Sequence, residues 1–347
     1  MEVRADLAEA DAVLAILAAR RTIGAVPDTL WGRLWATAGY RRLAERERGM
    51  GRAFSDSAFR AFVLSDTLRA REPALTAAVA WWRALDVSAP AARAAAYLPP
   101  GTALHATLYP VIKPAGNSFV YDLARDPAFF VYVDPVVTPA KLENTLAHEL
   151  HHVGYAAACD PAADARAAAL ARVMRRGGAD SVRAARLGVA YTWLGALGEG
   201  LAMLAAAGGP DVHPHAVSAD SDRTRWDRDV ANAPADLARL EQFLTAVLDG
   251  TLTDPTVVRR EAMSFFGVQG PWYTVGYVMA RTVEQAGGRA RLVAVACDPG
   301  AFLPAYDAAA AGENGRRARA RLGAPAGGAP LPRWSPALLA RLRTLPQ

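Results

Sequence analysis

The sequence is almost free of lysine and poor in cysteine and histidine. Only Lys113 and Lys141 are lysines, so the formal net charge of +5 over 347 residues comes from arginine. The arginines are scattered and form no basic stripe interleaved with aromatic side chains, which argues against a nucleic-acid partner. With 52% hydrophobic and 21% charged residues, the chain can bury a large core and does not have the composition of a disordered protein.

Features of secreted and membrane proteins are also missing. Two cysteines, Cys159 and Cys297, are too few for a disulfide framework and fit a reducing compartment, or a secreted protein that needs no cross-links. A signal peptide has an uninterrupted apolar region, and no run approaches the roughly 18 apolar residues of a membrane span. Charged residues interrupt the N-terminal stretch: Glu2, Arg4, Asp6, Glu9 and Asp11. We expect a cytoplasmic protein without a membrane span, or a secreted or periplasmic one if a leader has been removed.

Hydrophobic periodicity predicts a mainly helical α+β chain. Residues 1–98 have apolar positions at helical spacing and are expected to form a helical N-terminal region. A Pro-Pro-Gly sequence at 99–101 breaks that pattern. Three short stretches rich in β-branched and aromatic residues follow at 104–112, 118–122 and 128–134, separated by turn-forming residues. They predict a small antiparallel sheet.

The same periodicity predicts further helices downstream. Their expected ranges are 138–157, 161–175, 181–207, 234–249, 255–266, 273–285 and 336–342. Residues 208–229 are polar and contain prolines, which predicts an exposed loop or lid. The tail from about residue 312 is rich in Gly, Pro, Ala and Arg and is expected to be loosely packed.

The helix expected at 138–157 contains the pattern HExxH. Residues four apart on a helix lie one turn apart on the same face, so His148 and His152 can both bind one Zn²⁺ ion. Glu149 projects beside them, where its carboxylate can accept a proton from water activated by the metal. His151 points away from the pair and is expected to be solvated or locally hydrogen-bonded.

The surroundings of the motif also favour a helix. Thr138 is a good N-cap, and Pro139 at the first helical position loses no hydrogen bond it could have made. The other face carries Leu142, Leu146, Leu150 and Val153, which are expected to anchor the helix in the core.

A catalytic zinc site usually has three protein ligands, so the motif alone leaves one missing. A metzincin arrangement is excluded, because Tyr155 and Ala158 stand where its Gly and His would be. The other nearby candidates lie in contexts that do not distinguish them: Asp160, Asp164, Asp180, His213 and His215.

Glu199 is the strongest candidate for the third ligand. It is the first glutamate after Glu149, and the helix expected around it carries almost no other charge. Burying a lone carboxylate costs several kcal/mol unless something compensates it, and a zinc ion would do so. Gly198 and Gly200 leave room for close approach of another helix. The alternative is a protonated Glu199 or one paired with a buried arginine.

With these features the sequence resembles the gluzincin metallopeptidases, which combine HExxH with a downstream Glu, and in particular bacterial families described as zinc-dependent peptidases. The segments HELHH, GEGLA and GPWYTVGYVMA carry the likeness, which spans about residues 104–290. The resemblance implies a zincin-like catalytic region at 99–290, between the helical region at 1–98 and a C-terminal extension at 291–347. It implies Zn²⁺ as the cofactor and a peptide or protein as the substrate. The helix at 161–175 would then be an insertion relative to thermolysin-like enzymes.

The resemblance also implies further site residues. Asn117 and Ser118 are similar to the start of the strand whose edge binds the substrate backbone in these enzymes, although Asn117 is also an ordinary turn residue. A Tyr or His usually stabilises the oxyanion in this group. Tyr273 and Tyr277 lie one turn apart and are candidates, together with the two loop histidines. Arg281 lies on the same helical stripe and could hold a carboxylate.

Together these features predict a zinc-dependent hydrolase, most simply a metallopeptidase with Glu149 as the general base. Two alternatives stay open from the sequence: a zinc hydrolase of a non-peptide amide or ester, and a non-catalytic interaction protein with a structural zinc site. Glu149 argues against the second, because a structural site needs no base and normally closes its fourth position with a protein ligand. The oligomeric state is not indicated.

Overall fold

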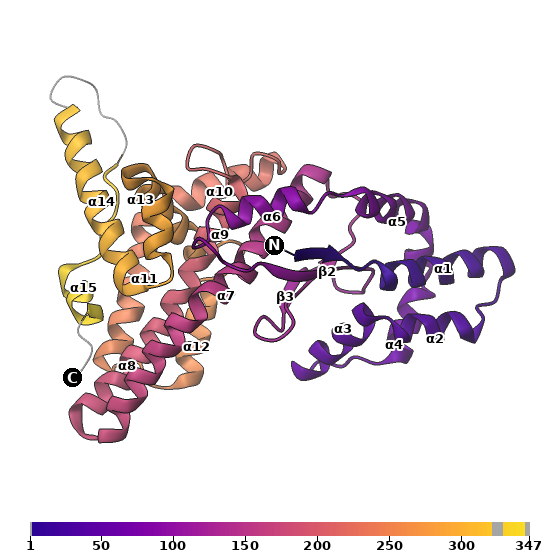
Figure 1. Ribbon diagram of the computed structural model, residues 1–347, viewed down its shortest axis with the longest axis horizontal. Helices are drawn as coiled ribbons and strands as arrows, with labels where there is room; N and C mark the ends of the chain where they lie inside the picture. The colour runs from indigo at the N-terminus through magenta and orange to yellow at the C-terminus, as the bar shows by residue number, and fades with distance from the viewer. Residues whose placement is uncertain (1, 321–328, 344–347) are drawn as a thin grey trace. The chain divides into compact units, whose positions relative to one another are not determined.

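The computed structural model describes residues 2–320 and 329–343 (Figure 1). The prediction of a mainly helical chain with a small sheet is confirmed. Contacts between Cα atoms divide the chain into two compact units. The first comprises Met1–Ala92 and Ala103–Val153, and the second comprises Arg93–Thr102 and Gly154–Gln347. Each unit has its own hydrophobic core.

Helices fill most of the N-terminal region, as the periodicity predicted. They are α1 (Ala8–Ile23), α2 (Asp28–Ala36), α3 (Ala38–Gly49), α4 (Asp56–Val63), α5 (Asp66–Ala84) and α6 (Ser88–Ala95). Side-chain caps set several of their starts: Thr37, Ser55 and Ser65 each accept a hydrogen bond from the backbone N–H three residues later. Residues 2–5 depart from the helical expectation and form a strand.

The described residues contain one sheet, with the strand order β1-β2-β4-β3. Its strands are β1 (Glu2–Ala5), β2 (His105–Val111), β3 (Phe119–Tyr121) and β4 (Ala128–Tyr132). β1 and β4 both run parallel to β2, and only β3 is antiparallel to its neighbour β4. The expectation of an antiparallel sheet is therefore wrong, and the sheet is mixed. The reason is that β3, the first strand of the β3–β4 hairpin, does not pair with β2. The second strand, β4, pairs with β2 and runs parallel to it, which leaves β3 at the edge of the sheet.

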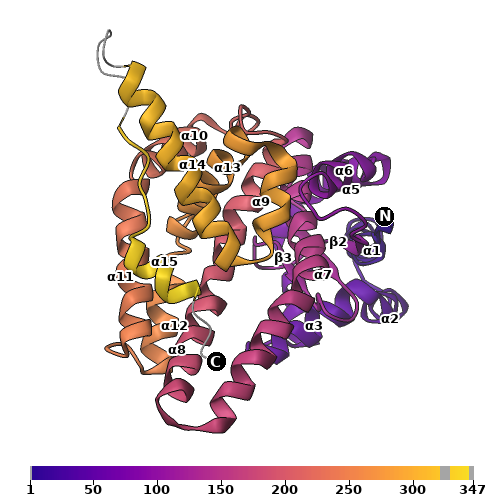
Figure 2. The same ribbon diagram turned by 60° about the vertical axis from the view of Figure 1, so that its left-hand side comes forward.

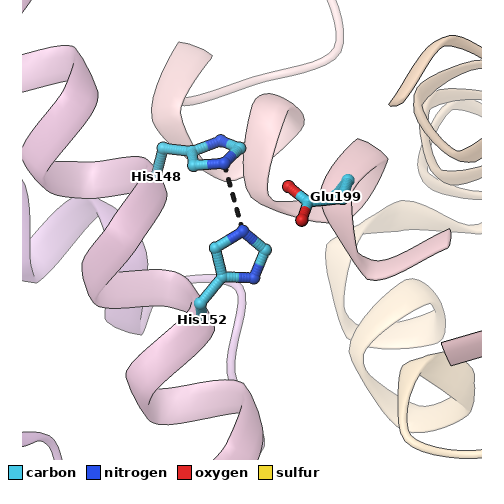
Figure 3. A group of neighbouring side chains, drawn as sticks. All are labelled: His148, His152 and Glu199. Carbon is cyan, nitrogen blue, oxygen red and sulfur yellow. Dashed lines mark hydrogen bonds between the residues drawn. The ribbon is translucent and has the colours of Figure 1, made fainter. Parts of the chain in front are cut away.

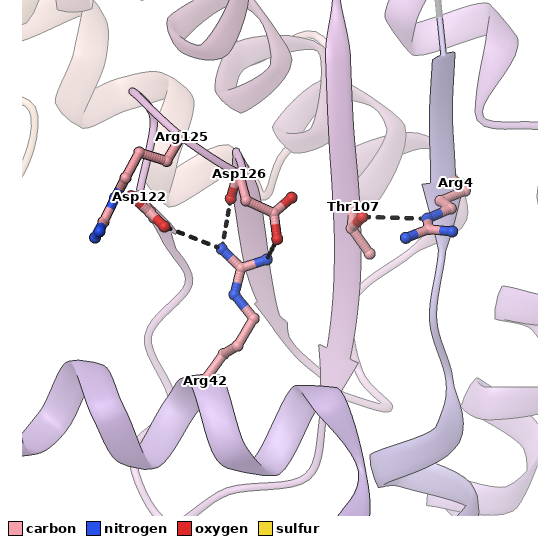
Figure 4. Close-up of polar contacts among 6 residues, drawn as sticks. All are labelled: Arg4, Arg42, Thr107, Asp122, Arg125 and Asp126. Atoms are coloured by element: carbon pink, nitrogen blue, oxygen red, sulfur yellow. Dashed lines mark hydrogen bonds and ion pairs between the residues drawn. The ribbon is translucent and has the colours of Figure 1, made fainter.

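Polar contacts hold both sides of this sheet (Figure 4). At the β3–β4 turn, Asp122 has a left-handed backbone with φ of 52°, and its carbonyl oxygen accepts a hydrogen bond from Asp126 N at 3.1 Å. Arg42 of α3 pairs with the Asp126 carboxylate at 2.6 Å and lies 3.8 Å from that of Asp122. At the opposite edge, Arg4 of β1 donates to Thr107 of β2 at 3.3 Å. The contacts of Arg42 stabilise the β3–β4 hairpin, and the contact of Arg4 joins β1 to β2.

One face of the sheet packs against helices of the same unit. Alternate residues of β2 and β4 share a core with α1 to α5, as the two-residue period of a strand requires: Tyr109, Val111, Ala128 and Phe130. Glu9 of α1 is 1% exposed, and its Oε2 accepts a hydrogen bond from Ile112 N at 3.0 Å. Burial raises the pKa of Glu9 to about 8.

The helix that carries HExxH is longer than predicted. α7 (Pro139–Arg176) is one helix, where two were expected at 138–157 and 161–175. Its start agrees with the sequence, because Thr138 Oγ1 accepts a hydrogen bond from Lys141 N at 3.3 Å. Pro161 lies inside the helix. A proline removes one helical hydrogen bond, but the alanines on both sides favour helix strongly enough for it to continue.

The second unit is entirely helical in its described part. Besides the end of α7 it contains α8 (Gly178–Leu194), η1 (Gly195–Leu197, a 3₁₀ turn), α9 (Gly198–Ala207), α10 (Asp220–Ala231), α11 (Ala233–Asp249), α12 (Pro255–Ser264), α13 (Pro271–Ala296), α14 (Pro299–Ala320) and α15 (Pro336–Arg343). α14 packs along α13, and α15 packs against α14 (Figure 2). The helix predicted at 336–342 is present as α15. The tail from about residue 312 was expected to be loosely packed, but its first residues, up to Ala320, belong to α14. Residues 321–328 of the tail lie outside the described residues.

The long apolar helix expected at 181–207 is present, as α8, η1 and α9 in direct succession. Its backbone stays in the right-handed helical region throughout, and at η1 it tightens locally to a 3₁₀ turn, which was not predicted. The expectation for residues 208–229 is wrong. This segment is not simply an exposed loop, because it includes most of α10 and Trp226 is 2% exposed.

The stretch Gly178–Ala207 is long and apolar enough to cross a membrane by length and composition alone. Buried residues of α8 and α9 belong to the core of the second unit. Nearly every residue of α9 is buried. These features describe a core helix pair rather than a membrane span.

Cys159 and Cys297 form a disulfide, which corrects the expectation of two unpaired thiols. The bond joins α7 to the residue that follows α13, and two further contacts lie beside it. Tyr155 Oη donates to the Ala296 carbonyl at 2.8 Å, and Arg166 pairs with Asp298 at 2.7 Å. The pairing was not predictable, because 138 residues separate the two cysteines and nothing in the sequence shows that these elements meet.

Candidate metal centre

The two histidines of the motif lie on one face of α7 with their rings together. Their Nε2 atoms are 3.1 Å apart, and the rings are T-shaped with centroids 4.7 Å apart. Both side chains are half-buried. The opposite face of the helix is buried through Leu146, Leu150 and Val153, as the pattern predicted, whereas Leu142 is half-buried. The helix therefore presents two imidazole nitrogens that can bind one ion.

Glu199 completes a group of three metal-ligating side chains (Figure 3). One ligand atom each from His148, His152 and Glu199 lie within 4.8 Å of one another. Figure 3 shows the carboxylate turned toward the two rings. Within the described part of the chain, these are the residues that form such a group.

The donor set fits zinc better than it fits a hard cation. Two imidazole nitrogens and one carboxylate oxygen are typical zinc ligands, whereas Ca²⁺ and Mg²⁺ prefer oxygen alone. Three protein ligands leave one position of a tetrahedral ion open, which is the arrangement of catalytic zinc sites. The residues present therefore suit a catalytic zinc ion.

Glu199 lies directly after the 3₁₀ turn η1. The backbone stays in the right-handed helical region through Leu197 and Gly198, so α9 continues the helix that α8 begins. A 3₁₀ turn has about three residues per turn instead of 3.6, so it changes the direction in which the following side chains point. Gly198 was expected to serve close packing within one continuous helix, and the local tightening before it was not predicted.

The residues beside His148 and His152 in the motif have different surroundings. Glu149 follows His148 directly on α7 and is half-buried. His151 was expected to be solvated or locally hydrogen-bonded; it is fully buried, which excludes the first of these two, and it does not belong to the group of metal-ligating residues. Its ring centroid is 6.4 Å from that of His152.

The other candidate ligands lie outside the metal group. The aspartates at 160, 164 and 180 do not belong to it. His213 Nε2 contacts the Asp227 carboxylate at 2.9 Å, and its Nδ1 accepts a hydrogen bond from His215 N. His215 Nδ1 contacts Ser218 Oγ at 3.0 Å, and burial lowers the His215 pKa. The two histidines therefore fix their own loop.

The candidate oxyanion donors lie on α13. Tyr277 is 5% exposed, its ring packs on Trp226, and burial raises its pKa. It also lines a cavity of about 220 Å³ together with Arg281. Tyr273 is half-buried, and its ring packs on Phe266. Arg281 donates to the Pro210 carbonyl at 2.7 Å, so its guanidinium is already engaged in fixing a loop.

The predicted substrate residues, Asn117 and Ser118, immediately precede the edge strand β3. Asn117 Oδ1 accepts a hydrogen bond from Lys113 Nζ at 2.9 Å, and Ser118 Oγ accepts one from Tyr132 N at 3.1 Å. Lys113 is 4% exposed and lies above the rings of Phe119 and Tyr132, and burial lowers its pKa to about 8. Both predicted side chains thus have structural partners within the sheet unit.

Comparison with known proteins identifies a family. The family described as "Putative zinc dependent peptidase (DUF5700)" matches residues 31–315, which is most of the chain. No curated protein and no solved structure matches the chain significantly.

Proposed function

The chain belongs to this family, and from the family's description together with the site we propose that it hydrolyses peptide bonds with a zinc ion held by His148, His152 and Glu199. The observation that carries the proposal is the convergence of these three side chains, two from α7 and one from α9, with ligand atoms within 4.8 Å. The same arrangement of HExxH and a downstream Glu supports a gluzincin-type, zincin-like core at about residues 99–290.

Zinc, when bound at such a site, supplies Lewis acidity that lowers the pKa of water toward neutrality. Glu149 then acts as the general base: its carboxylate accepts a proton from the attacking water as the new C–O bond forms at the scissile carbonyl. Glu149 returns that proton to the leaving amine as the C–N bond breaks. One water is consumed for each peptide bond, and Glu149 ends in its starting form.

We propose that the substrate backbone adds to the free edge of β3. β3 pairs with β4 on one side only, and an edge strand offers unpaired N–H and C=O groups to an extended peptide. The side-chain oxygen of Asn117 already accepts a hydrogen bond from Lys113 Nζ, so its amide N–H groups would be the donors to the peptide. Ser118 would contribute through its backbone, because its hydroxyl already binds Tyr132 N.

Of the two tyrosines, we favour Tyr273 as the donor to the oxyanion. Tyr277 packs on Trp226 and lines a cavity whose other lining residues include none of the three metal ligands. A hydroxyl donor typically contributes several kcal/mol to such a transition state. Tyr277 and the loop histidine His215 remain the alternatives.

The disulfide bears on where the protein works. Disulfides persist in oxidising compartments and are rare in the cytosol. The Cys159–Cys297 bond therefore supports a secreted or periplasmic location over the cytoplasmic one.

The proposal is tested with a mixed peptide library analysed by mass spectrometry. Glu149→Gln removes the base but none of the ligands, so we expect full zinc content and a turnover lower by about 10²–10⁴-fold. Asp164→Asn removes the same charge from an exposed position on the same helix and should leave turnover unchanged. Zinc-loaded protein that leaves every peptide intact would favour a non-peptide amide or ester substrate, or a structural zinc site. Equal cleavage by Glu149→Gln would contradict the mechanism.

A further inference from the structure

The helix that carries Glu199 touches α13 backbone to backbone. Gly200 of α9 and Gly276 of α13 meet at this crossing, where each lies against the main chain of the other helix. α9 and α13 also make the most extensive helix–helix contact of the described residues. The residue next to the proposed third ligand is therefore part of a tight helix crossing.

No side chain larger than hydrogen fits at either position. A Cβ atom at Gly200 would lie 2.0 Å from Tyr277 N and 2.2 Å from the Gly276 carbonyl carbon. A Cβ atom at Gly276 would lie 2.5 Å from the Leu197 carbonyl oxygen. These neighbours are backbone atoms, so no rotamer change can relieve the overlap, and the two helices would have to separate.

Other glycines of this segment do not share the constraint. A Cβ atom at Gly195, in η1, would have no heavy atom of another part of the chain within 4 Å, and one at Gly198 would make an ordinary contact of 3.9 Å with Tyr155. The close approach is therefore confined to the turn from Leu197 to Gly200, which contains Glu199, and is not a general property of this glycine-rich sequence.

The far end of α9 is held independently. Arg289 donates to the Gly208 carbonyl at 3.2 Å, and Arg93 donates to the Ala206 carbonyl at 3.4 Å. Arg289 is itself held by Glu284 at 3.1 Å. Cations that bind the last carbonyls of a helix stabilise its C-terminus. Separation at Gly200 would consequently tilt α9 about its fixed C-terminus and move its first turn the most.

We propose that Gly200 and Gly276 are positioning residues that set the place of the Glu199 carboxylate. A zinc–carboxylate bond has a length of about 2.0–2.2 Å, so a displacement on the order of 1 Å is enough to weaken it. In the proposed function Glu199 is a metal ligand, and the positioning role depends on that assignment. The contact means that the third ligand is held in place before the metal arrives.

The test compares zinc affinity by competition with a chromogenic chelator. Gly200→Ala and Gly276→Ala should each bind zinc at least about 10-fold more weakly than the wild type, as expected when the support of a metal ligand is removed. Gly195→Ala is the matched control, since it adds the same methyl group nearby without a clash, and its zinc affinity should be unchanged. Wild-type affinity in both test variants would overturn the inference.

A double-mutant cycle separates positioning from general damage. In the Glu199→Ala background, Gly276→Ala should have no further effect on zinc affinity, because the group that it displaces is gone. An equal loss in both backgrounds would show that the glycine acts on the fold and not through Glu199. Failure of the wild type to bind zinc would instead refute the proposed function, so the two failures are distinguishable.

A measurement on the wild type covers the case in which the variants do not fold. Backbone amides at the start of α9 should be equally protected from hydrogen exchange with and without zinc, because the contact with α13 already orders them. A large gain of protection at residues 199–203 on zinc addition would overturn the inference.

Discussion

Breaking the Cys159–Cys297 bond should destabilise the protein substantially without unfolding it. The bond closes a loop between residues 138 apart, and the chain-entropy relation for a loop of that length gives about 5 kcal/mol at 25 °C. Measured effects of native disulfides are typically about 2–5 kcal/mol. Tyr155 and Arg166 hold the same junction through the Ala296 carbonyl and Asp298, so the reduced protein should keep its structure. We expect a loss of about 2–5 kcal/mol.

The assay is guanidinium unfolding of metal-free protein with and without a phosphine reductant. The double variant Cys159→Ala/Cys297→Ala is the matched control, because the reductant should not change its unfolding free energy. Thiol titration should find no free thiol in protein purified without reductant and two after reduction and denaturation. Two free thiols before reduction would refute the pairing, and an unchanged unfolding free energy after complete reduction would refute the energetic reasoning.

Three further predictions concern single side chains. Burial raises the Glu9 pKa from 4.5 to about 8, so between these pH values the folded protein holds a proton that the unfolded chain has lost, and the unfolding free energy should fall by up to about 1.4 kcal/mol per pH unit. Glu9→Gln should remove this part of the pH dependence, measured by urea unfolding at pH 5.5, 7 and 8.5. The same pH dependence in Glu9→Gln and the wild type would contradict the assignment. Tyr273→Phe should lower kcat by about 10²–10³-fold with little change in KM. A larger loss of kcat in Tyr277→Phe would show that Tyr277, and not Tyr273, is the donor to the oxyanion. Lys113→Met should raise KM for peptides with little loss of zinc, because Asn117 loses its partner, whereas an unchanged KM would argue against substrate binding at β3.

The parts of the site that the sequence predicts are those governed by local rules. The HExxH spacing follows from helix geometry, and Thr138 caps α7 as expected. Glu199 stands out because a lone carboxylate in an apolar helix needs compensation, and the structure brings it to the two histidines. Its exact place was not predictable, because the 3₁₀ turn before Gly198 depends on how α9 packs against α13.

The parts that the sequence does not predict depend on contacts between distant residues. Strand order in the sheet is set by how β4 inserts beside β2, which a stretch of apolar residues does not encode. The four residues of β1 are largely exposed and too few to give a periodic signal, and they become a strand only by pairing with β2. The break expected at Pro161 is absent because the helix propensity of the surrounding alanines outweighs one lost hydrogen bond.

Zinc content tests the central claim most directly. Protein dialysed against zinc and then against buffer should carry one zinc per chain by atomic emission spectrometry, and Glu199→Ala should lose it under the same dialysis while Asp164→Ala keeps it. Full zinc content in Glu199→Ala would contradict a metal centre formed by His148, His152 and Glu199.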